Sequence, residues 1–83
     1  MKLDEVERTE LEYRAGSSDK VYIAILEKNE DNAYRVTFRY GKRWQVNNTI
    51  CKPESGTIPY GEAKYIYEDM ISKKLKKGYS IRN

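Results

Sequence analysis

The chain of 83 residues contains no histidine and a single cysteine, Cys51. Without histidine it lacks the side chain that most often serves as a general base or a metal ligand near neutral pH. One cysteine excludes an internal disulfide and a cysteine-based zinc cage, which needs several thiolates or added imidazoles. We therefore expect no metal, no cofactor and no enzymatic activity. Cys51 is expected to be a small, partly buried hydrophobic residue.

Long apolar runs are also missing. No run approaches the roughly 20 residues that a membrane-spanning helix needs. The sequence Met1-Lys2-Leu3-Asp4-Glu5 turns acidic at once, which is unlike a signal peptide. We expect one cytoplasmic domain over residues 1–83, with a core over about residues 7–80 and a flexible segment over residues 1–6.

Aromatic residues supply most of the bulky apolar material: eight tyrosines, one tryptophan and one phenylalanine. A chain this short buries only about 60% of its unfolded surface, so its core must be small. Tyrosine suits such a core because its ring packs inside while its hydroxyl reaches water. The composition therefore indicates a small folded domain and not a disordered chain.

The first part of the chain shows the two-residue alternation that is typical of β-strands. Candidate strands cover residues 9–14, 21–27, 34–40 and, with a weaker pattern, 46–52. The alternation is clearest in residues 34–40. One face of that strand holds Tyr34, Val36, Phe38 and Tyr40. The opposite face holds Arg35, Thr37 and Arg39.

From about residue 60 to 77 the apolar spacing changes to three and four residues, which predicts an amphipathic helix. Its apolar stripe consists of Ala63, Ile66, Tyr67, Met70, Ile71 and Leu75. Lysines crowd the last turn, where they complement the helix dipole, and Gly78 follows as the residue that ends the helix. The predicted fold class is α+β: a small antiparallel β-sheet with one amphipathic C-terminal α-helix packed on one face.

The net charge of +3 conceals an uneven distribution. Residues 1–31 carry a net charge of −4, whereas residues 32–52 carry five basic groups and no acidic one. Residues 64–83 carry a net charge of +4. If the fold brings the two basic segments together, they form an electrostatic footprint for a polyanion. The alternative is that the C-terminal lysines simply solvate a helix face.

Two short runs stand at fixed places in this order of elements. Arg39-Tyr40-Gly41-Lys42 ends the third strand, and Lys76-Lys77-Gly78-Tyr79 follows the helix. In the order and spacing of these runs, over about residues 7–80, the chain resembles the WGR domain family. That family includes stand-alone bacterial proteins and a domain of poly(ADP-ribose) polymerases. The Trp-Gly-Arg run that names the family stands here as Tyr40-Gly41-Lys42.

The resemblance implies a function, because WGR domains of poly(ADP-ribose) polymerases contact DNA at breaks. There the family tryptophan packs on the sugar of a strand terminus, and basic groups hold the backbone. We therefore expect a nucleic-acid-binding module for DNA ends, nicks or single-strand junctions. The candidate binding residues are Arg35, Arg39, Tyr40, Lys42, Arg43 and Trp44. Lys42 keeps the charge of the family arginine but lacks its planar fork.

The residues also leave alternatives open. Tyr40 and Trp44 either contact a ligand or belong to the core. Arg35 and Arg39 either contact phosphates or pair with acidic residues of the second or first strand. The second hypothesis for function is a protein–protein interaction module that binds no nucleic acid. We expect a monomer with no membrane partner, although under the second hypothesis the chain could dock on a protein partner or on itself.

Overall fold

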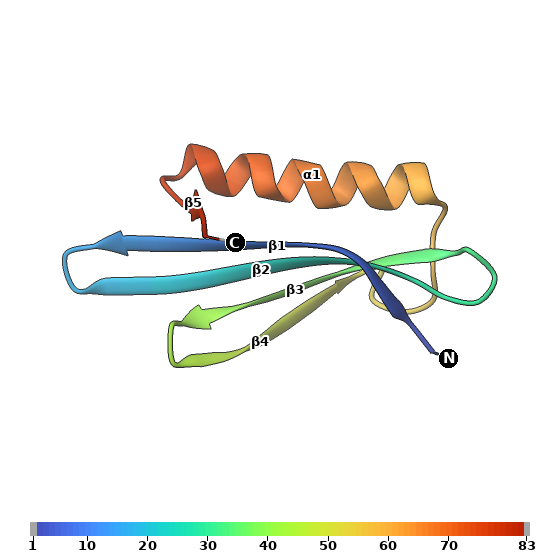
Figure 1. Ribbon diagram of the computed structural model, residues 1–83, viewed down its shortest axis with the longest axis horizontal. Helices are drawn as coiled ribbons and strands as arrows, with labels where there is room; N and C mark the ends of the chain where they lie inside the picture. The colour runs from blue at the N-terminus through green and yellow to red at the C-terminus, as the bar shows by residue number, and fades with distance from the viewer. Residues whose placement is uncertain (1, 83) are drawn as a thin grey trace.

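The structure is a computed structural model that describes residues 2–82. Within this range the chain forms a five-stranded antiparallel sheet and one helix. The elements are β1 (Asp4–Ala15), β2 (Ser18–Lys28), β3 (Tyr34–Lys42), β4 (Gln45–Lys52), α1 (Tyr60–Lys76) and β5 (Ser80–Ile81). In Figure 1 the helix lies along one side of the sheet. The predicted α+β class, with an antiparallel sheet and a C-terminal helix, is confirmed.

The strand order is β4-β3-β2-β1-β5, so the first four strands form a meander and β5 adds to its far edge. After α1 the chain returns beside β1, where Ile81 pairs with Leu11. β1 begins earlier than the sequence pattern predicts. Asp4 already pairs with Lys28, although residues 1–6 were expected to be flexible. The long β2 provides a backbone partner for these charged residues, and backbone pairing leaves no trace in their hydrophobic pattern.

The main core lies on one side of the sheet, which we call the helix face. It joins sheet residues to two residues of α1 in a single buried cluster. The cluster consists of Leu11, Tyr22, Ala24, Leu26, Val36, Phe38, Ala63 and Tyr67. The hydroxyl groups of Thr9 and Tyr67 share a hydrogen bond of 2.7 Å, so the buried tyrosine ring retains a polar partner.

The other side of the sheet, which we call the open face, has no helix over it in Figure 1. Even so, Val21 and Ile25 are only 2% and 7% exposed there. Strand alternation places both on the side opposite Tyr22 and Ala24. Long side chains of neighbouring strands can shield such residues, because their aliphatic stems lie along apolar surface.

A close approach of β3 and β4 requires glycine at position 41. Gly41 has a φ of +153°, and a Cβ built there would lie 2.3 Å from the carbonyl oxygen of Gln45. The strand register shifts at this point, between Tyr40 and Lys42. The sequence pattern predicts a strand over residues 34–40, and β3 continues two residues further, to Lys42. Glycine thus allows the strand to bend while its pairing resumes at Lys42 and Gln45.

We expect Gly41→Ala to lower the free energy of unfolding by about 1–3 kcal/mol or more, because the new methyl group meets backbone and the φ is unfavourable. Gly61→Ala is the matched control, since Gly61 lies in α1 with no heavy atom within 4 Å of its Cβ position. That control should raise stability by about 0.4–1 kcal/mol. Urea denaturation followed by circular dichroism measures both. Equal stability of the two variants would contradict the role given to Gly41.

Candidate nucleic-acid interface

The sheet divides the candidate binding residues between its two faces. Tyr40 pairs with Tyr22 and shares the helix face with it, and Lys42 lies opposite Lys20 at the end of the same face. Arg35 and Arg39 alternate with these residues and project from the open face. The structure therefore does not gather all six candidates, Arg35, Arg39, Tyr40, Lys42, Arg43 and Trp44, into one surface.

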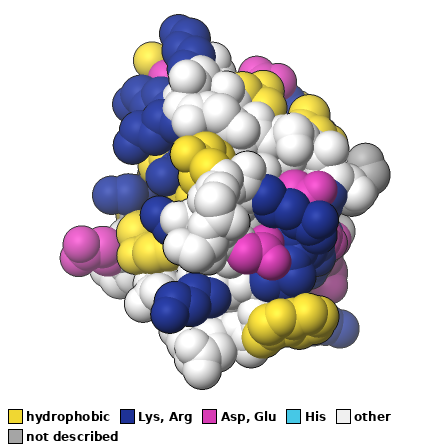
Figure 2. Space-filling model, turned by 90° about the vertical axis from the view of Figure 1, so that its left-hand side faces the viewer, with side chains coloured by type: hydrophobic (Ala, Val, Ile, Leu, Met, Phe, Trp, Pro, Cys, Tyr) yellow, Lys and Arg dark blue, Asp and Glu magenta, His cyan; other side chains and the backbone are white. Residues whose placement is uncertain are grey.

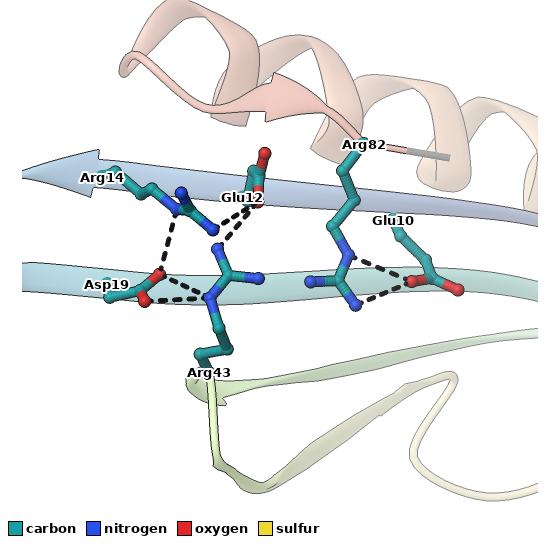
Figure 3. A network of polar contacts seen from close by, with 6 residues as sticks. All are labelled: Glu10, Glu12, Arg14, Asp19, Arg43 and Arg82. Carbon is teal, nitrogen blue, oxygen red and sulfur yellow. Dashed lines mark hydrogen bonds and ion pairs between the residues drawn. The ribbon is translucent and has the colours of Figure 1, made fainter.

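Arg43 is held on the open face by two carboxylates. Its Nε donates to both oxygens of Asp19, at 3.0 and 2.9 Å, and its Nη2 donates to Oε1 of Glu12 at 2.8 Å. Figure 3 shows this guanidinium reaching across β2 toward β1, with Arg14 and Arg82 beside it in the same row of charges. The Arg43 side chain is only 14% exposed. Arg43 thus stabilises the sheet and offers no free fork to a phosphate.

The two arginines that β3 places on the open face, Arg35 and Arg39, are not paired in this way. Arg39 is exposed and Arg35 is half-buried. Arg35 lies opposite Glu27 in the strand register, yet neither arginine forms an ion pair within residues 2–82. The Nε of Arg35 is buried and has no hydrogen-bond partner within residues 2–82. The cross-strand ion pairs considered for Arg35 and Arg39 are therefore not formed.

Trp44 lies in the turn between β3 and β4 and is 88% exposed. Trp44 is therefore exposed and does not belong to the core. The only non-glycine residue with a positive φ among residues 2–82 is Asn32. The bulky side chain at position 44 therefore imposes no left-handed backbone strain.

A groove opens on the helix face at the end of the molecule where α1 finishes. Its volume is about 790 Å³. We call it the lysine–tyrosine groove, after lining residues Lys20, Lys42, Lys74, Tyr22, Tyr40 and Tyr79. Figure 2 views this end of the molecule and shows basic side chains gathered along its left side, with hydrophobic side chains between them. On the right side of the same view, basic and acidic side chains lie next to one another.

The lysines of the groove come from three elements and have no acidic partners. Lys20 of β2 and Lys42 of β3 lie directly opposite each other, and Lys74 comes from the end of α1. A smaller adjoining hollow adds Lys77. None of these four lysines forms an ion pair within the described part of the chain. Like charges in direct cross-strand pairs are destabilising, so Lys20 and Lys42 keep positive charges that no carboxylate of residues 2–82 neutralises.

Two tyrosine rings lie beside one of these lysines. The Lys74 Nζ lies 4.5 Å from the ring centroid of Tyr22 and 5.6 Å from that of Tyr79. Burial lowers the pKa of Lys74, and the charges of Lys77 and Lys20 lower it further. Burial also raises the pKa of Tyr22 to about 12, with smaller contributions from Tyr40 and Tyr79. Near neutral pH the Tyr22 hydroxyl is therefore neutral, and an anion in the groove would relieve the repulsion at Lys74.

The two sequence runs that carry the WGR resemblance meet at this groove. Tyr40, Gly41 and Lys42 line it from β3, and Tyr79 lines it from the segment that follows α1. Comparison of the chain with protein-family models, curated proteins and solved structures finds no match. The resemblance stays a prediction that rests on the motifs themselves.

Sequence reasoning missed part of the groove. Lys20, Lys74, Tyr22 and Tyr79 were not among the candidate residues, although Lys76-Lys77-Gly78-Tyr79 and the basic C-terminal segment pointed to this region. No simple pattern marks Lys20, because its position opposite Lys42 depends on the register of β2 and β3. Within residues 2–82 no group of acidic or cysteine side chains could hold a metal ion. In that range no helix is long and apolar enough to cross a membrane.

We expect Arg43→Met to lower the free energy of unfolding at neutral pH and to flatten its decline in acid. Hydrogen bonds from Arg43 lower the pKa of Glu12 and of Asp19 below their ordinary values of 4.5 and 3.8. A carboxyl group with a lowered folded-state pKa contributes stability above its unfolded pKa, and this contribution is lost as the pH falls through the folded pKa. Urea denaturation from about pH 7 to about pH 2 measures the difference.

Arg14→Met is the matched control for this experiment. Arg14 approaches the same two carboxylates only to 3.9 and 3.7 Å, and its side chain is 66% exposed. Exposed ion pairs contribute little, so this variant should keep most of the pH dependence. A similar loss in both variants would show that Arg43 is not the central cation of the network.

Proposed function

We propose that this chain is a nucleic-acid-binding module, with single-stranded DNA at ends, nicks or junctions as its favoured ligand. The observation that carries the proposal is the set of four lysines without acidic partners beside tyrosine rings in and next to one groove. Proteins that bind single strands combine a positively charged groove for the backbone with aromatic side chains for the bases. The lysine–tyrosine groove has both components.

The distribution of charge supports a polyanionic ligand at this groove in particular. On the open face, Arg43 and Arg82 form ion pairs with carboxylates of the sheet, which neutralise much of their charge. At the groove the fold instead places Lys20, Lys42 and Lys74 together at a cost in repulsion. Binding a polyanion removes that repulsion and releases counterions, which favours association.

The shape of the groove favours an unpaired strand. Its volume of about 790 Å³ lies within the roughly 300–1,000 Å³ of sites that enclose small ligands. The groove is open to solvent and has room for a nucleotide, whereas the bases of a duplex are stacked inside and must leave the stack to contact its lining residues. The WGR resemblance supports the same ligand, because Tyr40-Gly41-Lys42 lies at the groove.

We expect the protein to bind a labelled single-stranded oligonucleotide with an affinity that falls steeply as salt rises. For single strands the slope of log K against log salt is about −0.7 per phosphate neutralised, so up to four lysines predict about −3. Lys74→Met should weaken binding and make the slope shallower by about 0.7. Fluorescence anisotropy at several salt concentrations measures both the affinity and the slope.

Lys73→Met is the matched control, because it removes the same charge from the same helix. Lys73 is 65% exposed, pairs with Asp69 at 2.9 Å and does not line the groove. It should leave the slope nearly unchanged. Binding without salt dependence, or an equal effect of both variants, would rule out phosphate contacts in the groove.

The second candidate function is a protein–protein interaction module, and the exposed Trp44 favours it. Tryptophan is enriched among the residues that dominate binding energy at protein interfaces. Under this alternative the wild type should bind no nucleic acid and should self-associate in sedimentation equilibrium, and Trp44→Ala should abolish the association. If sedimentation equilibrium shows a monomer at every concentration, the chain does not act by self-association.

A further inference from the structure

We propose that β4 makes the lysine–tyrosine groove a reader of one unpaired base, so that the module recognises a base as well as the phosphates beside it. This inference rests on the proposed function and names the part of the ligand that the groove encloses. The observation behind it is a pair of amide side chains that line the groove from β4: Gln45, which lies opposite Lys42, and Asn48, which lies opposite Tyr40.

Side-chain amides have the chemistry that base edges require. Each carries an NH₂ donor and a carbonyl acceptor, and the edges of nucleobases present donors and acceptors side by side. Gln45 is exposed, and its amide forms no hydrogen bond within residues 2–82. Asn48 makes one contact, from Nδ2 to the carbonyl oxygen of Tyr40 at 3.4 Å, which is long for a hydrogen bond. These donors and acceptors are therefore available to a ligand.

The remaining lining residues suit the flat, apolar faces of a base. Tyr40 is half-buried and stacks on Tyr22, with ring centroids 5.5 Å apart and an interplanar angle of 20°. Ile50, which is 36% exposed, and Met70 add apolar surface to the groove. A site for phosphate alone needs neither aromatic rings nor apolar surface, since its binding energy comes from charge.

The groove thus contains two kinds of chemistry on different elements. Lysines come from β2, the end of β3 and the end of α1, whereas the amides come from β4. A nucleotide has the same division, with an anionic phosphate at one end and a planar base at the other. An unpaired nucleotide can present both ends together, whereas a paired base keeps its edge engaged with its partner strand.

The test compares three probes: oligothymidine, an abasic phosphodiester strand of equal length and inorganic polyphosphate. We expect oligothymidine to bind about 5- to 150-fold more tightly than the abasic strand. This range corresponds to about 1–3 kcal/mol for one base on an aromatic platform, at about 1.4 kcal/mol per tenfold change. Polyphosphate should bind through the lysines and should compete with both strands.

A double variant, Gln45→Ala with Asn48→Ala, tests the amides directly. It should reduce the preference for oligothymidine over the abasic strand and leave polyphosphate binding unchanged. Thr49→Ala is the matched control, because Thr49 lies on β4 opposite Arg39 and so projects from the open face. Lys74→Met should weaken all three probes. Circular dichroism confirms that each variant is folded.

The outcomes separate this inference from the proposed function. Equal affinity for oligothymidine and the abasic strand, with binding that depends on salt, would overturn base recognition and leave the nucleic-acid-binding module standing. An unchanged preference in the double variant would overturn the role of the amides. Failure of all three probes to bind at low salt would overturn the proposed function together with this inference.

Discussion

The register between β2 and β3 is the constraint on which the candidate site depends. It sets Tyr22 opposite Tyr40 and Lys20 opposite Lys42, and α1 then adds Lys74 beside them. Because side chains alternate along a strand, a slip of β3 by one residue would turn Tyr40 and Lys42 to the other face of the sheet. The buried cluster prevents such a slip, since Ala24 and Phe38 also face each other in this register.

The two faces of the sheet use charge in different ways. On the open face, carboxylates of β1 and β2 bind arginines from distant parts of the chain, such as Arg43 and Arg82. Those pairs tie the β3–β4 turn and the C-terminal segment to the sheet, so that charge contributes to the fold. At the groove, lysines lie together with no acidic partner among residues 2–82, and their mutual repulsion opposes folding. A local arrangement that costs stability is the kind of departure expected where a protein binds a ligand.

Much of the fold could be predicted from the sequence, but only part of the site could. Alternation in Tyr34–Tyr40 and the helical spacing after residue 60 located β3 and α1, because both patterns follow from local geometry. Arg43 shows where such reasoning ends. In the sequence it stands beside Lys42 as one more basic residue, yet its guanidinium binds Asp19, which is 24 positions away. Short-range patterns cannot reveal a partner at that separation.

The sequence by itself determined the type of each main element, the absence of histidine chemistry and the presence of two basic segments. These properties depend on composition and on the spacing of near neighbours. Only the tertiary structure decided which basic residues are free. It paired Arg43 with carboxylates, left Trp44 in solvent, and brought Lys20, Lys42 and Lys74 around three tyrosines. Strand register and the position of the helix determine which basic residues are paired, because they set which distant side chains come within reach of one another.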